Sequence, residues 1–162
     1  MPDEIEEVEE PRRLPETQYA YLCITGSGPS QSITEQLDIK PSKEWSEGDP
    51  WNRGHFTERF FTHWSLESGL MHTEDLNEHI RAILQKVRRK RAVLLELATQ
   101  YDVKITCVSY DRQSFSFELD FDLQRELTNF GIRLWFDTYV ANDPHTLIQD
   151  LRAQISRKIG TD

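Results

Sequence analysis

The run Tyr19-Ala-Tyr-Leu-Cys-Ile-Thr25 begins the folded part of this chain. Aromatic and β-branched residues dominate the run, and Gly26-Ser-Gly-Pro29 follows it, so together they predict a β-strand that ends in a tight turn. A short helix is expected after the turn, with Ser30 or Ser32 as its N-cap. The fold is therefore expected to start with a strand, a turn and a helix.

The middle of the chain alternates between strand and helix patterns. A strand is expected at 58–66. The longest helix follows it, capped by Thr73 and carrying apolar residues at helical spacing as far as Ala98. Apolar and polar residues alternate over Ser114–Phe121, soon after the strand-like run Val103–Ser109. These two runs predict an antiparallel β-hairpin.

Both ends of the chain have patterns of their own. Asp122 is expected to cap a helix that stops at Gly131, and a last strand is expected at 132–137. An aspartate and a proline suited to the N-cap and first helical positions predict a final helix over 143–162. Residues 1–16 hold seven acidic residues against two arginines and have no apolar periodicity, so they predict a disordered acidic tail.

This mixture of elements favours an α+β fold. We expect one mostly antiparallel sheet with helices packed on one face, and a ferredoxin-like arrangement is the closest simple model. The length of 162 residues suits a single domain, which we place at 17–142. The acidic tail at 1–16 precedes it, and the helix at 143–162 packs on it or extends it.

Charge and composition narrow the class of protein. The formal net charge is -9, of which seven acids and two arginines in the tail contribute -5 and the remainder contributes -4. An acidic body repels nucleic acid and attracts basic partners. No apolar run approaches the roughly 20 residues that span a bilayer, and no secretory signal is found at the start. We therefore expect a cytoplasmic protein that binds neither nucleic acid nor membrane.

Residues that could perform chemistry form no compact motif. Asp49, His55, His63 and His72 are the acid and imidazole groups nearest to one another in sequence, but the histidines are eight and nine residues apart. Such spacing matches no metal site. The basic cluster at 86–91 is expected to be a solvated helix face. No catalytic residue, metal or cofactor is therefore predicted, and an enzyme is the less favoured class.

The two cysteines also fit a structural role. Cys23 and Cys107 lie on predicted strands and are far apart in sequence, without a second cysteine or histidine at a ligand-like spacing. Each is expected to be a small buried hydrophobic residue.

A tryptophan cluster is the main candidate for function. Trp45, Trp51 and Trp64 lie within twenty residues of one another. The alternation of its strand places Trp64 in the core, whereas Trp45 and Trp51 lie in a predicted loop over 40–56, a length that is often functional. These two rings either pin the loop to the sheet or recognise a partner. The candidate binding residues are Trp45, Asp49, Trp51, Arg53, His55 and Trp135.

Several pieces of the chain together resemble a known family. They are, in order, Ile33-Thr34-x-x-Leu37-x-Ile39-x-Pro41, Gly48-Asp49, Trp64-Ser65-Leu66 and Gly131-x-x-Leu134-x-Phe136-Asp137-x-Tyr139-Val140. Over about residues 19–140 this pattern resembles the bacterial domain-of-unknown-function 4279 family. Asp38 stands where the family pattern has glycine, so the first helix is expected to end differently here. The resemblance implies a small α+β domain and transfers no catalytic residue.

Two functional hypotheses follow. The first is a non-enzymatic module that binds another protein, in its most specific form an immunity protein or antitoxin that neutralises a basic toxin. The rival is a small-ligand-binding protein or hydrolase that uses the 40–56 loop as a lid, with Asp49, His55 and His63 as acid–base groups. A purely structural subunit is a third possibility, and the oligomeric state is left open.

Overall fold

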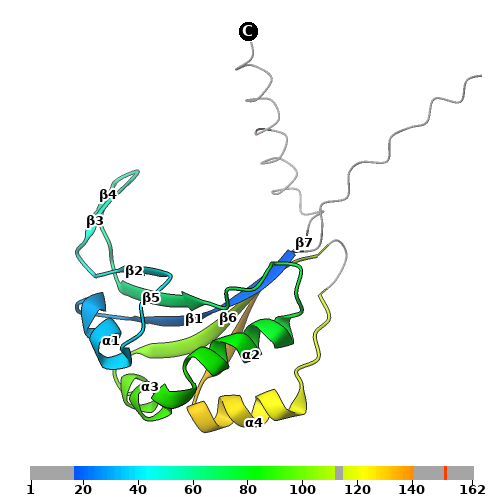
Figure 1. Cartoon of the computed structure of the whole chain (residues 1–162). Coiled ribbons are helices and arrows are strands. Elements are labelled where there is room, and N and C mark those ends of the chain that lie inside the picture. The colour runs from blue at the N-terminus through cyan, green and yellow to red at the C-terminus, as the bar shows by residue number, and fades with distance from the viewer. Residues whose placement is uncertain (1–16, 112–114, 141–151, 153–162) are drawn as a thin grey trace, which may run out of the picture.

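The computed structural model describes residues 17–111, 115–140 and 152. The predicted acidic tail at 1–16 and the predicted helix at 143–162 lie outside the described residues, apart from Arg152. Within them the chain forms an α+β fold in which helices pack against one face of a sheet (Figure 1). The predicted fold class is thus confirmed.

A five-stranded sheet in the order β2-β5-β1-β6-β7 is the frame of the molecule. The pairs β2–β5, β5–β1 and β1–β6 are antiparallel, whereas β6–β7 is parallel. The predicted ferredoxin-like arrangement is not confirmed. The strands of this sheet are β1 (Thr17–Gly26), β2 (Lys43–Trp45), β5 (Thr62–Glu67), β6 (Asp102–Asp111) and β7 (Arg133–Val140).

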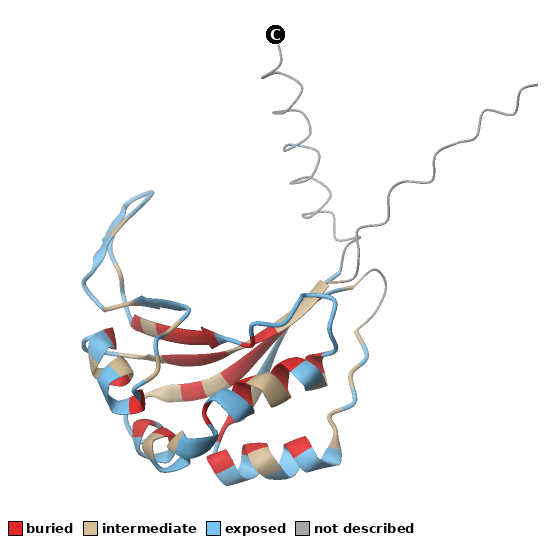
Figure 2. Cartoon of the chain, viewed as in Figure 1, coloured by how far each residue is buried: buried red, intermediate tan, exposed pale blue. Residues whose placement is uncertain are grey.

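The α-helices cover one face of the sheet because each of them has one buried apolar side (Figure 2). On β1 the residues that meet them are Ala20, Leu22 and Ile24, while Tyr19 and Tyr21 point to the opposite face. The described helices are α1 (Ser30–Leu37), α2 (Leu76–Lys86), a 3₁₀ turn η1 (Arg88–Lys90), α3 (Arg91–Leu97) and α4 (Phe121–Phe130).

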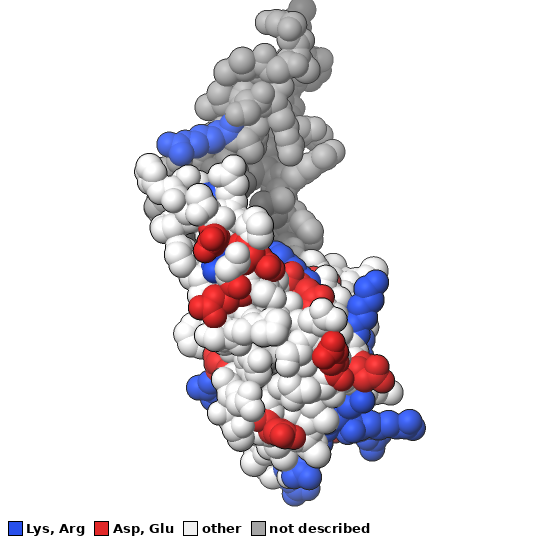
Figure 3. Space-filling view, turned by 90° about the vertical axis from the view of Figure 1, so that its left-hand side faces the viewer, with Lys and Arg blue, Asp and Glu red and all other residues white. Residues whose placement is uncertain are grey.

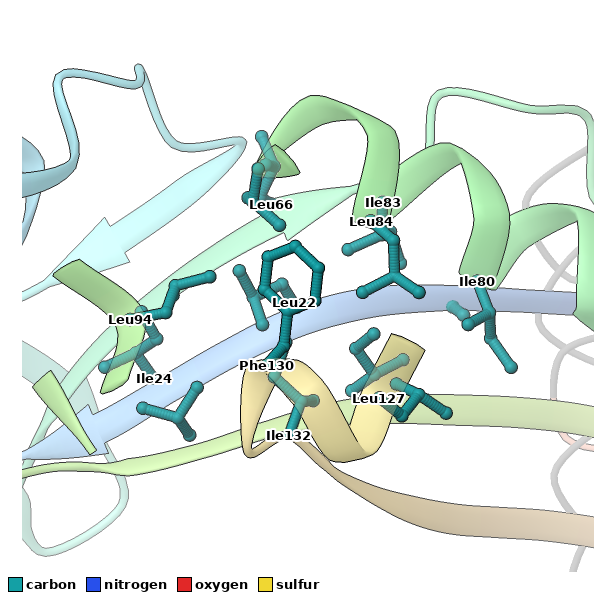
Figure 4. Close-up of a cluster of buried hydrophobic side chains, with 14 of the residues drawn as sticks. Leu22, Ile24, Leu66, Ile80, Ile83, Leu84, Leu94, Leu127, Phe130 and Ile132 are labelled. Carbon is teal, nitrogen blue, oxygen red and sulfur yellow. The ribbon is translucent and has the colours of Figure 1, made fainter. Parts of the chain in front are cut away.

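The core is built around β1. Leu22 and Ile24 are fully buried, and side chains from α2 and α4 converge on them (Figure 4). Full burial of such a side chain contributes about 1.5–3 kcal/mol. Trp64 of β5 is also fully buried, as predicted, and its indole N–H donates to Thr34 Oγ1 of α1 at 3.0 Å. Trp64 therefore fastens α1 to the sheet.

The predicted long helix is divided in two. Asp75, and not Thr73, is the N-cap of α2, because its carboxylate accepts a hydrogen bond from the Asn77 backbone N–H at 2.8 Å. The helix stops at Val87, which is fully buried, and the chain turns through η1 before α3 begins. The predicted apolar stripe is buried as far as Leu94, but Ala98 is exposed. Periodicity found the buried residues and missed the bend between them.

The predicted hairpin at 103–121 is wrong. Its first half forms β6, but residues 115–120 are not a strand, and Phe121 begins α4. Both edges of β6 are already occupied, by β1 and by β7. The alternating side chains Phe115 and Phe117 instead pack against the core and lie 5.7 and 5.4 Å from the ring of Phe136 on β7.

Two other predicted caps are also wrong. Neither Ser30 nor Ser32 precedes α1, which begins after Pro29; the Ser30 backbone N–H donates to Ser46 Oγ at 2.8 Å. That helix end is therefore satisfied by a residue from a distant segment. Asp120, not Asp122, precedes α4.

The predicted end of α4 is confirmed. Gly131 ends the helix in the left-handed conformation, with a φ of 64°. Glycine is favoured there because it has no β-carbon to clash with the backbone.

Asp38 shows how α1 ends. Its φ of 52° and ψ of 41° are left-handed, and it is the one non-glycine residue with positive φ in the described part of the chain. Its backbone N–H donates to Thr34 O at 2.7 Å. Asp38 therefore adopts the conformation that glycine favours at the end of a helix.

We expect Asp38→Gly to stabilise the fold. A left-handed residue with a β-carbon costs about 1–2 kcal/mol, and the greater chain entropy of glycine offsets part of this. The unfolding free energy in urea should therefore rise by about 0.5–1 kcal/mol. Asp38→Ala is the control, because it removes the carboxylate but keeps the β-carbon. Equal stabilisation by both substitutions would mean that charge, not backbone strain, is relieved.

Candidate functional site

An arm projects from the β2 edge of the sheet, where a loop over 40–56 was predicted (Figure 1). We define the arm as residues 46–61. It contains a small sheet of its own, formed by β3 (Pro50–Arg53) and β4 (Phe56–Glu58). Part of the predicted loop is therefore strand, and the strand predicted at 58–66 begins only at Thr62.

The base of the arm is fastened by hydrogen bonds. The backbone N–H of Gly48 donates to Arg59 O at 2.9 Å, and the N–H of Arg59 donates to Asp49 O at 2.9 Å. The Asp49 carboxylate accepts from the Ser46 N–H at 2.7 Å. Thr62 Oγ1 accepts from the Glu47 N–H at 3.0 Å. Asp49, a predicted binding residue, thus shapes the base of the arm.

Arg59 lies between the two tryptophans of the predicted site. Its guanidinium carbon is 4.2 Å from the ring centroid of Trp45 and 4.5 Å from that of Trp51. Each such cation–π contact contributes about 0.5–2 kcal/mol, depending on how far water is excluded. Both tryptophans are half-buried, so they hold the arm against the sheet edge. Arg59 lies within the strand predicted at 58–66, and nothing in the local sequence pattern indicates this role.

Three phenylalanines of the arm face solvent. Phe56, Phe60 and Phe61 are 52, 62 and 46% exposed. Phe56 and Phe60 meet edge to face with ring centroids 4.9 Å apart, and Phe56 stacks on Trp51 at 6.4 Å. Phe60 lies within the strand predicted at 58–66 but is exposed, whereas Thr62, two residues later, is fully buried. Large apolar side chains gathered on a projecting element are typical of an interaction site.

Glu47 and Glu58 lie beside Phe56 and Phe60. Within residues 43–61 four acids and two bases are exposed, and the third base, Arg59, is held between the tryptophan rings. Figure 3 shows acidic side chains spread down this side of the molecule, with basic side chains around its margin from the upper left to the lower edge. The exposed acids are Glu44, Glu47, Asp49 and Glu58, and the exposed bases are Lys43 and Arg53.

The structure brings some of the predicted site residues together and separates others. Arg53 and His55 lie exposed at the tip of the arm. Trp135 lies on β7, four strands away from Trp45 on β2, which corresponds to about 19 Å at the usual strand spacing. It is 58% exposed, and Lys104 Nζ lies 5.1 Å from its ring. Trp135 therefore belongs to a different surface.

A hollow lies beside the arm on the sheet face opposite the helices. Its volume is about 320 Å³, and on its floor His63 stacks on Trp45 with ring centroids 4.2 Å apart. The rival hypothesis needs Asp49, His55 and His63 close together as acid–base groups. The structure instead places Asp49 at the base of the arm, His55 at its tip and His63 on the sheet. The lining residues are Tyr19, Tyr21, Lys43, Trp45, His63, Ser65 and Glu67.

His63 and Cys23 are neighbours but are both neutral. His63 Nδ1 lies 3.7 Å from Cys23 Sγ. Burial, together with the positive charges of Lys43 and Arg59, lowers the pKa of His63 to about 4. Burial raises the pKa of the Cys23 thiol to about 11. The pair is therefore a thiol beside a neutral imidazole at pH 7, and not the thiolate that nucleophilic catalysis uses.

Two general findings concern the described residues alone. Among residues 17–111, 115–140 and 152, no group of three His, Cys, Asp or Glu side chains is placed to hold a metal ion. Over the same residues, each helix is too short or too polar to cross a membrane.

Stability should fall when the pH is lowered through the titration of the buried histidines. His63 has a depressed pKa, and so does His79, whose burial lowers it and whose Nδ1 lies 2.6 Å from Ser68 Oγ. The unfolded chain binds these protons below about pH 6.5, whereas the folded protein resists them, so the unfolding free energy declines from pH 7 toward 4.

Urea unfolding at several pH values tests this decline. His63→Gln and His79→Gln, alone and together, cannot bind those protons and should flatten the slope of unfolding free energy against pH. An unchanged slope in the double variant would assign the acid sensitivity to carboxylates.

Loss of Arg59 should free the arm. Arg59→Ala removes both cation–π contacts, so we expect a red shift of tryptophan fluorescence and a several-fold faster tryptic cut after Arg53 at the tip. Arg59→Lys should have an intermediate effect, since lysine keeps the charge but not the flat guanidinium. Arg125→Ala is the matched control, because Arg125 stacks on Phe121 of α4, 4.8 Å from its ring. Equal cutting of all three variants would contradict the role of Arg59.

Comparison with known proteins identifies one family. No curated protein matches the chain, and no solved structure does. A family model described as a domain of unknown function (DUF4279) matches residues 16–141, a range that includes the arm, the sheet and all the described helices. The match confirms the resemblance that the motifs indicated, and it covers well more than half of the chain. The chain therefore belongs to the DUF4279 family.

Proposed function

We propose that this chain is a non-enzymatic module that binds a basic protein partner through its aromatic arm. The observation that carries the proposal is the group of exposed phenylalanines Phe56, Phe60 and Phe61, framed by acidic side chains. The rings contact one another and the two tryptophans, yet about half of each remains exposed, so the arm alone does not bury them.

The energetics of association support this use of the arm. Full burial of a phenylalanine contributes about 1.5–3 kcal/mol, so covering the exposed parts of three rings contributes a few kcal/mol. The arm is also held in place before binding by Arg59, which reduces the entropy lost when a partner docks. Rigid aromatic rings at the centre of a contact are the residues that most often dominate binding energy.

The charge around the rings supports the choice of partner. We define the acidic rim as the exposed residues Glu47 and Glu58, which lie beside Phe56 and Phe60, and the chain as a whole has a net charge of -9. Such a rim favours a positively charged surface and speeds the approach of a basic protein. The most specific version of the proposal is an immunity protein or antitoxin that neutralises a basic toxin in the cytoplasm.

Substitution of the arm phenylalanines tests the proposal. The full chain is used to capture its partner from native lysate, and bound proteins are identified by mass spectrometry. We expect Phe60→Ala and Phe56→Ala to weaken capture of a basic protein at least tenfold, and added salt to weaken it further. Phe121→Ala is the matched control, since Phe121 is 68% exposed but lies on α4. Capture that is indifferent to the arm variants, or lost equally with Phe121→Ala, would refute the arm as the contact surface.

The hollow of about 320 Å³ beside Trp45 and His63 supports one alternative, a small-ligand protein that uses the arm as a lid. Its volume lies within the range of ligand sites. The hydrolase form of this alternative is less well supported, because the neutral thiol and imidazole lack activation. The same capture experiment separates the two proposals, since a small-ligand protein retains no protein partner.

A further inference from the structure

The edge strand β7 is the longest exposed edge of the sheet. It pairs with β6 over all eight of its residues without a shift in register. In the part of the chain that the structure describes, no strand pairs with its other side. The opposite edge, β2, is only three residues long. An edge strand presents a row of free N–H and C=O groups on which another strand can pair.

Large side chains are exposed on both faces of β7. Trp135 and Tyr139 face the side without helices and are 58 and 42% exposed. Phe136 and Val140 face the helix side and are 40 and 41% exposed. Monomeric proteins usually protect such an edge with charged side chains, proline or a bulge; β7 has no proline or bulge, and its two charged residues, Arg133 and Asp137, lie on one face only. An antiparallel partner strand would cover both faces at once.

The charges of β7 point to a second copy of this chain as the partner. Arg133 and Asp137 flank Trp135 at equal distances along the strand. If two copies pair antiparallel about a two-fold axis at Trp135, each Arg133 lies opposite the partner copy's Asp137, and Leu134 lies opposite Phe136. Opposite charges and apolar residues that face each other across a pair are both stabilising. A register centred on Asp137 instead places two carboxylates face to face.

Arg133 can make this contact in addition to the one that it already has. It already forms an ion pair with Asp102, but its side chain is 74% exposed and a guanidinium has further N–H donors. Asp137 accepts a hydrogen bond from Tyr139 OH at 2.9 Å, which leaves its other oxygen for a second donor.

We infer that two copies of this chain associate through antiparallel pairing of their β7 strands, centred on Trp135, into one continuous sheet. The two-fold axis makes the same residues serve on both sides of the interface. The arm lies at the opposite edge of the sheet, beside β2. Each copy would therefore keep its arm available for the proposed protein partner.

Mass measurement of the full chain is the first test. Sedimentation or light scattering from about 1 to 100 µM should show a shift toward twice the 19.1 kDa of one chain. Asp137→Arg should weaken this dimer at least tenfold, because Arg133 then meets a second cation. Glu35→Arg makes the same change of charge on α1 and should leave the mass unchanged. A monomer at every concentration, or a dimer indifferent to Asp137→Arg, would overturn the inference.

Disulfide trapping tests the register. Trp135→Cys places two thiols opposite each other at the axis, where Cα atoms are about 4.5–5.5 Å apart, a distance that a disulfide spans. Asp137→Cys places them about 13 Å apart along the strands, too far to link. We expect covalent dimers from Trp135→Cys alone. Linking by Asp137→Cys instead would overturn the proposed pairing. Loss of the dimer in Phe60→Ala would show that the interface lies on the arm, and this result would also overturn the inference.

Discussion

One-sided burial of the central strand is the constraint on which the rest of the molecule depends. Leu22 and Ile24 of β1 point to the helix side and are fully buried, so every described helix is gathered on that side. No described helix covers the opposite face, which carries Tyr19 and Tyr21 on the central strand β1, Trp45 on the edge strand β2 and Trp135 on the edge strand β7. The same arrangement leaves β2 and β7 as edges. The surfaces to which we assign function are therefore the parts of the sheet and the arm that the core does not bury.

Arg59 connects the arm to this frame. It holds Trp51 of the arm and Trp45 of the sheet edge through one guanidinium, and Trp45 in turn stacks on His63. Burial of the imidazole, together with the positive charges of Lys43 and Arg59, keeps His63 neutral. An exposed aromatic element can therefore project from the sheet without being loose. In the proposed function, fixing the arm in advance lets its phenylalanines contribute to binding, because less entropy is lost on docking.

The core was more predictable from sequence than the contacts that position the site. Helical periodicity identified Ile80, Ile83 and Leu84, and strand alternation identified Trp64, because the core selects apolar residues at fixed spacing. Alternation failed at Phe115 and Phe117, since an extended segment packed on β7 has the same period as a strand.

Caps and arm contacts were missed for a related reason. The donor and acceptor are far apart in sequence, as with Ser46 and the first N–H of α1. Sequence alone determined the fold class, the one-sided helices, the family and the aromatic character of residues 45–64, because local pattern and composition carry that information. Only the tertiary structure decided that Arg59 joins two tryptophans, that Phe60 faces solvent and that Trp135 lies at the far edge of the sheet. Those outcomes depend on which strands pair, and strand pairing is set by the whole chain.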